Sequence, residues 1–266
     1  MKIYISADIE GIAGIAHPSE TDKSKADYGE FGKRMTKHVS AACQAAVEAG
    51  AHEILVNDAH DTGRNILHDD LPQCARLLRG WSEHPLMMVQ ELDESFDAVA
   101  MLGYHARAGS GGNPLSHTLS SARLDEMRIN GREVAEFHLY AYAAASLGVP
   151  VVFVSGDEEL CRDVHEANDN IVTVPTLEGI GASVIGRHPS IVEEEIRAGI
   201  NRALRGDLNE CELNLPERFV LELSYTRASE AYRASFYPGA ELADTRLLRF
   251  ETGEYFEVLR ALTFVI

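Results

Sequence analysis

The chain has 266 residues, of which 45% are hydrophobic and 25% are charged, and this composition suits a globular protein with one large domain or two smaller ones. Its formal net charge of -18 disfavours nucleic acid and anionic membrane surfaces as partners, and no stretch approaches the roughly 20 apolar residues needed to span a bilayer. The four cysteines form no C-x-x-C pair and no signal-like apolar run precedes Asp8, so we expect a cytoplasmic protein.

The first expected strand, residues 3–7, runs directly into two carboxylates. Apolar and polar residues alternate along it, and Asp8 and Glu10 follow. Side chains two residues apart in an extended chain point to the same face, so these carboxylates should project together. Two carboxylates at such a short distance repel each other, and a cation between them removes this repulsion. We interpret this stretch as half of a metal site; the alternative is a strand that ends in an acidic, solvated loop.

A second polar cluster follows the next expected strand. Helical spacing predicts a helix over residues 28–49, with Gly50 suited to its C-terminal cap. The apolar run 54–56 is typical of a strand buried on both faces, and it leads into Asp58 and His60. A strand–helix–strand unit has parallel strands, so both clusters should lie at the same carboxyl edge of a sheet, where ligands bind in open α/β folds.

A third strand adds a histidine to this edge. Residues 97–104 read as a buried strand that ends on His105, and a further strand is expected at 87–89. The glycine-rich segment 106–114 could be a flap over the site or an ordinary flexible loop, and it lacks the Lys-Ser/Thr of a phosphate-binding P-loop. His117 follows in an apparently short strand.

Two glutamates stand near the start of a helix expected over residues 132–147. Glu133 and Glu136 could simply complement the helix dipole, or one of them could turn into the site as a metal ligand. The spacing alone leaves both interpretations open.

The remaining pattern predicts the fold class. Strand and helix patterns alternate up to about residue 204, the stretch "LNECELNLPERF" marks a break, and from Phe219 the pattern changes to an alternating strand, a short helix and a mixed segment. We expect an α/β fold with a mostly parallel central sheet and helices on both faces. Residues 1–206 would form the metal-binding catalytic core, and residues 207–266 a C-terminal α+β portion packed on it.

The candidate site residues share imidazole or carboxylate chemistry; they are Asp8, Glu10, Asp58, His60, His105, His117 and one of Glu133 or Glu136. Such mixed ligands suit zinc, with manganese or cobalt as alternatives. Five or more ligands are too many for one tetrahedral zinc with an open position, and they suit two metals about 3.5–4 Å apart, bridged by a carboxylate. The expected chemistry is hydrolysis of an amide or an ester.

The motifs "ADIEG", "VNDAH", "LGYHARA", "SHT" and "ING-R-x-V-x-E" occur in this order, and through them the chain resembles the D-aminopeptidases of the dipeptide-transport operon type, a dizinc peptidase family. The resemblance runs through nearly the whole chain up to the C-terminal segment. It implies an α/β fold, a ring-shaped homodecamer with a central channel, and release of N-terminal D-amino acids such as D-Ala from short peptides by attack of a metal-bound hydroxide.

The resemblance also implies a role for each site residue. His117 matches the catalytic histidine and would carry a proton or stabilise the tetrahedral intermediate. Asp58 would orient His60 or an adjacent loop. We expect Asp8 to be the bridge, because its carboxylate has two oxygens. Ala135 stands where the family pattern has a glycine, with Glu133 as a nearby competitor for the glutamate position. The two zinc ions per subunit would be held by Asp8, Glu10, His60, His105 and Glu136.

Three other functions compete with this interpretation. A dinuclear metal phosphoesterase could use similar ligands, but it needs a positive anchor for phosphate, and Arg107 and Arg123 are the only nearby candidates. A peptide-binding protein of a transport system would need an export signal. A non-catalytic oligomer with a vestigial metal site is the third.

Overall fold

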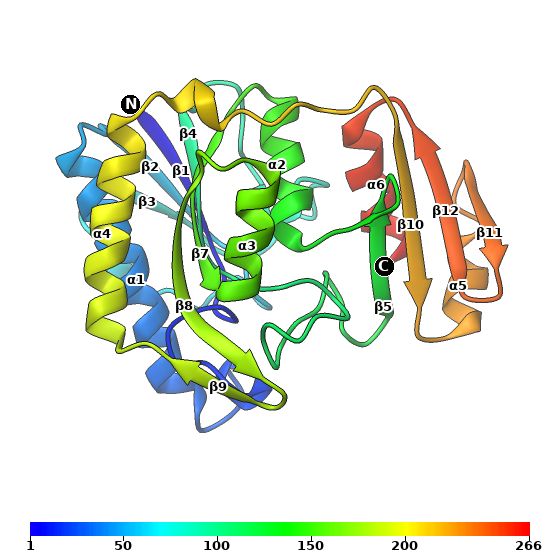
Figure 1. Ribbon diagram of the computed structural model, residues 1–266, viewed down its shortest axis with the longest axis horizontal. Coiled ribbons are helices and arrows are strands. Elements are labelled where there is room, and N and C mark those ends of the chain that lie inside the picture. The colour runs from blue at the N-terminus through cyan, green and yellow to red at the C-terminus, as the bar shows by residue number, and fades with distance from the viewer.

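The computed structural model describes residues 1–266 and contains two sheets side by side (Figure 1). The larger sheet has parallel neighbours apart from its last pair, in which β9 runs antiparallel to β8. Its strands, in spatial order, are β3 (Ala75–Leu78), β2 (Glu53–Asp58), β1 (Lys2–Ala7), β4 (Ala98–Tyr104), β7 (Val151–Asp157), β8 (Val172–Ile180) and β9 (Ser183–Gly186). Every residue of β4 and β7 is buried, as continuous apolar runs in a two-sided sheet predict.

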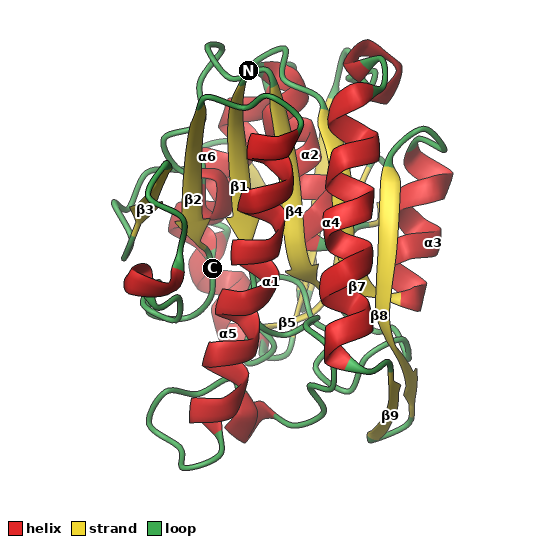
Figure 2. Ribbon diagram, turned by 90° about the vertical axis from the view of Figure 1, so that its left-hand side faces the viewer, coloured by secondary structure: helices red, strands yellow, loops and turns green.

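Helices cover both faces of this sheet, which confirms the predicted fold class. Figure 2 shows α1 (Tyr28–Glu48) and α4 (Pro189–Arg205) in front of the strands, with α2 (Glu136–Ser146) and α3 (Glu158–Ala167) behind them. Helix α1 follows β1 and returns the chain to β2, so the crossover makes these two strands parallel. None of the helices combines the length and the apolar character that a membrane crossing requires.

The second sheet is antiparallel and draws on two distant parts of the chain. Its strands are β11 (Ala240–Asp244), β12 (Leu247–Thr252), β10 (Phe219–Tyr225), β5 (Leu124–Ile129) and β6 (Arg132–Glu133). Buried and half-buried residues alternate along β10, because one face packs inward. Two helices accompany this sheet, α5 (Ala228–Ala234) and α6 (Tyr255–Val265), and α6 packs between the sheet and α2. The division at residue 206 stays a prediction, with β5 and β6 belonging to the second sheet.

The structure corrects three local predictions. Residues Met87–Val89 form a 3-10 helix, η3, instead of a strand, because the Met88 carbonyl accepts hydrogen bonds from the side chains of Ser6 and Asn57 rather than from a neighbouring strand. His117 lies in a loop, not in a strand. The helix expected from residue 132 begins at Glu136, because β5 and β6 form a hairpin through Asn130 and Gly131, both in the left-handed region.

The sequence reading also missed β3, a strand of only four residues at the edge of the larger sheet. The other short 3-10 helices are η1 (Pro18–Glu20), η2 (His68–Asp70) and η4 (Leu208–Cys211).

Candidate metal centre

The carboxyl ends of three adjacent parallel strands meet at one point of the larger sheet. In the register, Ala7 of β1 lies beside Asp58 of β2 and beside Leu102 of β4, so the residues that follow these strands converge. The turn after Glu10 lies against β4 so closely that a Cβ atom at Gly11 would stand 1.8 Å from the Tyr104 carbonyl oxygen. Close approach of the two backbones thus brings the first acidic cluster to His105, the residue that follows β4.

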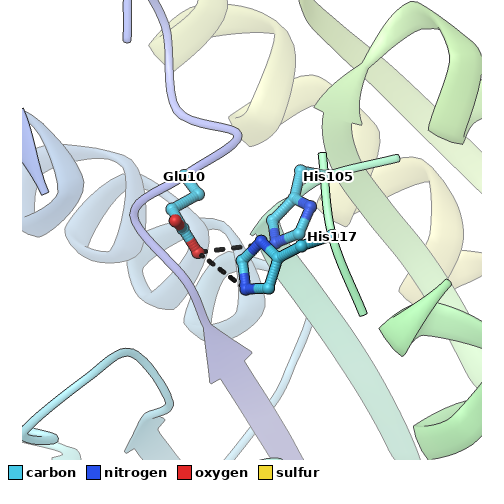
Figure 3. A group of neighbouring side chains, drawn as sticks. All are labelled: Glu10, His105 and His117. Atoms are coloured by element: carbon cyan, nitrogen blue, oxygen red, sulfur yellow. Dashed lines mark ion pairs between the residues drawn. The ribbon is translucent and has the colours of Figure 1, made fainter. Parts of the chain in front are cut away.

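The side chains at this point form three overlapping groups, each able to hold a metal ion. The groups are Asp8 with Glu10 and His60, Asp8 with His105 and Glu136, and Glu10 with His105 and His117. Figure 3 shows the third group, in which the Glu10 carboxylate faces both imidazole rings. The structure therefore brings together all six residues that the sequence assigned to the metal ions and to proton transfer.

Two histidine nitrogens point at the carboxylates. His60 Nδ1 lies 3.1 Å from Asp8 Oδ1 and 3.3 Å from Glu10 Oε2. His105 Nε2 lies 3.5 Å from Glu10 Oε2, and 3.7 Å from both Asp8 Oδ2 and Glu136 Oε2. Asp8 thus turns one oxygen toward each histidine, which is the arrangement expected of a bridging carboxylate. The bridge itself stays a prediction.

The surroundings of His105 indicate that these side chains fit a metal ion. Its Nδ1 donates a hydrogen bond of 2.9 Å to the Ala106 carbonyl, which leaves Nε2 as the nitrogen that faces the carboxylates. This Nε2 is buried and has no hydrogen-bond partner. A buried imidazole nitrogen without a partner, facing carboxylates from two separate segments of the chain, fits a divalent cation with mixed nitrogen and oxygen ligands.

The histidines and carboxylates of the cluster stabilise one another's charged forms. Burial opposes the charged form of His60 and His105, but the neighbouring carboxylates outweigh it and hold the pKa of both imidazoles well above the ordinary value: Asp8 and Glu10 for His60, and Glu10, Glu136 and Asp8 for His105. Burial likewise raises the pKa of Glu10, but the two histidines overcome this and hold it well below its usual range. The pKa of Glu136 is raised, mainly by burial. The protein supplies these carboxylates with no Lys or Arg partner, so a dication is their natural counter-charge.

Glu133 and Glu136, which the sequence could not separate, lie in different surroundings. Glu133 accepts a hydrogen bond of 2.8 Å from Arg107 Nε and a longer one from Arg128, and it belongs to none of the three groups. Glu136 is the first residue of α2 and is buried, and its Oε1 accepts a hydrogen bond of 2.8 Å from the Leu119 backbone N–H. The geometry therefore favours Glu136 as the ligand.

Asp58 lies just outside the cluster, and its carboxylate binds the loop of Asn65 and Ile66 instead of the His60 imidazole ring. Its carboxylate accepts hydrogen bonds from the backbone N–H groups of Asn65 and Ile66 and from the Asn65 side chain. Asn65 Nδ2 also donates to the His60 backbone carbonyl at 2.7 Å. Asp58 thus holds the loop that carries His60, while no hydrogen bond joins the Asp58 carboxylate to the His60 imidazole.

Comparisons with known proteins agree over the whole chain. The D-aminopeptidase family matches residues 1–264. A D-aminopeptidase of Bacillus subtilis (strain 168) is 30% identical over 264 residues, which cover 98% of this chain and 95% of that protein. This chain belongs to the D-aminopeptidase family. A solved structure described as the Zn-dependent D-aminopeptidase DppA from Bacillus subtilis, a self-compartmentalizing protease, superimposes with a TM-score of 0.92 at 29% identity, covering 100% of this chain and 96% of that one. The resemblance found in the motifs is confirmed.

In this member of the D-aminopeptidase family the cluster opens into a cavity of about 490 Å³. The cavity lining also contains apolar side chains that the sequence analysis did not assign to the site: Trp81, Met87, Met88, Leu119, Tyr140, Leu262 and Ile266. Tyr140 could have been found, because it stands four residues after Glu136 on the same face of α2. The α6 residues carry no local signal, since only the packing of α6 against α2 brings them here.

The cavity lacks a lysine or arginine anchor for a phosphate group. Neither lysine nor arginine is among its lining residues. Arg107, one of the two candidate anchors, pairs with Glu133 at 2.8 Å and Glu159 at 3.0 Å instead. The surroundings of the D-aminopeptidase cluster thus disfavour a phosphoesterase.

Proposed function

We propose that this protein is a zinc-dependent aminopeptidase that releases N-terminal D-amino acids, such as D-Ala, from short peptides. The observation that carries the proposal is the unpartnered, buried His105 Nε2, which faces three carboxylates, two from the turn after β1 and one from α2, beside an open cavity. Family membership supports the same chemistry, because the superimposed relative is a Zn-dependent D-aminopeptidase.

Two zinc ions per subunit account for the size of the donor set. The five proposed ligands are Asp8, Glu10, His60, His105 and Glu136. They form two of the three groups, Asp8 with Glu10 and His60 and Asp8 with His105 and Glu136, and the sharing of Asp8 supports two adjacent ions over one. Zinc at this position supplies a Lewis acid for the peptide carbonyl and lowers the pKa of a water molecule to near neutrality.

The other residues position the substrate and handle its proton. His117 Nδ1 donates to the Leu115 carbonyl at 2.8 Å, so its Nε2 faces the cluster and can hold or release a proton at the reacting group. We assign His117 this catalytic role. Asp61 and Glu83 also line the cavity and add negative charge that attracts the free amino terminus of a peptide.

The assembly and location proposed from the sequence accompany this function. We propose a homodecamer in the cytoplasm, with short peptides as its partners. The description of the relative as self-compartmentalizing supports an assembly of several subunits, while the number ten rests on the family resemblance alone.

The decisive experiment compares cleavage of D-alanyl and L-alanyl dipeptides by the purified protein before chelation, after chelation and after zinc is returned. We expect cleavage of the D-peptide only, abolished by the chelator and restored by zinc. Zinc-dependent cleavage of L-peptides alone would leave the metal chemistry standing and refute the stereochemical proposal. Absence of cleavage of either peptide by the zinc-loaded protein would refute the peptidase itself.

A further inference from the structure

Thr118 ties together three segments of the chain that carry site residues. Its side chain is fully buried. In the sequence it stands between His117, the catalytic candidate, and Leu119. The Thr118 hydroxyl donates a hydrogen bond of 2.9 Å to the Val134 carbonyl and accepts one of 3.1 Å from the Ala108 backbone N–H. One oxygen atom therefore joins the loop after β4, the loop of His117 and the segment that enters α2.

The residues on either side of Thr118 act directly on the cluster. The Leu119 N–H holds Glu136 Oε1 at 2.8 Å, with Leu119 in the left-handed region at a φ of 62°. His117 Nε2 lies 3.8 Å from the same Glu136 oxygen. A non-glycine residue keeps such a conformation only where its surroundings enforce it, and the adjacent Thr118 supplies two of the enforcing hydrogen bonds.

We infer that Thr118 is a positioning residue that keeps His117 and Glu136 in register with each other. The inference rests on the proposed function for the roles of those two residues. Val134 lies two residues before Glu136, so its hydrogen bond to Thr118 fixes the start of α2 against the loop that carries His117. Without the hydroxyl, the buried Ala108 N–H and Val134 carbonyl lose their hydrogen-bond partner, and a shift of the loop that restores a partner to them becomes favourable.

The experiment removes the hydroxyl at constant shape. Thr118→Val keeps the volume and loses both hydrogen bonds, whereas Thr118→Ser keeps the hydroxyl and loses only a methyl group. Thr36→Val is the matched control, because Thr36 is also buried and its hydroxyl donates 2.8 Å to the Gly32 carbonyl and accepts 3.0 Å from the Leu67 N–H. Thr36 belongs to α1 and lines no part of the cavity.

Two quantities are measured for each protein: the zinc dissociation constant, by competition with a chromophoric chelator, and kcat on a D-alanyl dipeptide. In Thr118→Val we expect zinc affinity to weaken about ten- to hundredfold and kcat to fall by at least about tenfold, because small misplacements of site groups are costly. Thr118→Ser should stay within about threefold of the wild type in both, and Thr36→Val should lower Tm without changing either, since its lost bonds lie outside the site.

The inference is overturned if Thr118→Val matches Thr36→Val in zinc affinity and kcat, or if Thr118→Ser is as defective as Thr118→Val. Should circular dichroism show that Thr118→Val is unfolded, Thr118→Ala carries the same comparison without a new methyl group. Failure of the wild type to cleave D-peptides would refute the proposed function, while the zinc affinities would still decide the role of Thr118.

Discussion

The imidazole rings of His105 and His117 stack, with their centroids 4.6 Å apart and an angle of 20° between their planes. They differ in access to the cavity, because the His105 side chain is 0% exposed and the His117 side chain 15%. The closed ring suits a ligand, and the open ring suits a group that exchanges protons with a substrate. Both rings nevertheless face Glu10 Oε2, so a test must separate ligand from proton carrier.

Replacement of His117 by alanine supplies that test. We expect His117→Ala to retain its zinc, because Asp8, Glu10, His60, His105 and Glu136 remain, and to lose about 10²- to 10⁴-fold in kcat, the usual contribution of a general acid or base. Zinc content by elemental analysis and kcat on a D-alanyl dipeptide are measured on the same sample. Loss of zinc along with turnover would make His117 a ligand.

Substitutions of Glu133, which precedes α2, and of Glu136, which begins it, should differ in their effect on zinc affinity. Glu136→Gln keeps the size of the side chain and removes a buried charge from the cluster, so zinc affinity should fall by at least about tenfold. Glu133→Gln breaks an ion pair with Arg107 near the surface and should leave zinc affinity unchanged. Chelator competition measures both variants, and a loss confined to Glu133→Gln would reverse the assignment.

The convergence of Asp8, Glu10, His60 and His105 could be predicted from the sequence, because it follows from the order and direction of the strands that precede them. The runs before Asp8, Asp58 and His105 are recognisably strands, and the helix between the first two makes them parallel. Their carboxyl ends must then share one edge of the sheet. Asp8 and Glu10 lie just past the end of β1 in a turn, so their proximity does not depend on the strand period that suggested it.

Much of the apolar lining of the cavity could not be predicted, because long-range packing creates it. Leu262 reaches the site on α6, whose place depends on the pairing of β10 with β5, nearly a hundred residues apart in sequence. The apolar segment Met87–Val89 resembles a strand locally, but buried hydrogen bonds from Ser6 and Asn57 to the Met88 carbonyl hold it as a 3-10 helix. Tertiary contacts overrule local pattern at both places.

Removal of the metal should lower stability as well as activity. Zinc binds the folded cluster and so stabilises the native state, by about 2.7 kcal/mol at a free concentration one hundred times Kd, which corresponds to about 5–10 °C in Tm for a chain of this size. Thermal unfolding with and without a chelator measures the shift. His60→Ala removes a proposed ligand and should shrink the shift, and an equal Tm for the wild type under both conditions would contradict a structural contribution of the metal.

His38 predicts a pH dependence of stability that is independent of the cluster. It lies on α1 with 1% exposure, and neither ring nitrogen has a hydrogen-bond partner. Burial, with a smaller contribution from Arg34, lowers the pKa of His38 to about 3. The native protein therefore leaves this imidazole neutral at pH values where the unfolded chain, with an ordinary pKa of about 6.5, already binds a proton.

The sign of the effect follows from this difference. Because the unfolded state binds more protons, stability falls as the pH drops below about 6.5 toward 3, and His38 alone should remove about 2 kcal/mol between pH 7 and pH 5. His38→Leu has no titrating group at this position, so its free energy of unfolding should lose that much less over the same interval. Urea unfolding of both proteins in metal-free form measures the difference, because the titration of the cluster is then common to the two. At pH 7.5 the comparison gives the packing effect of leucine alone, and parallel pH profiles for the two proteins would show that the buried ring does not resist protonation.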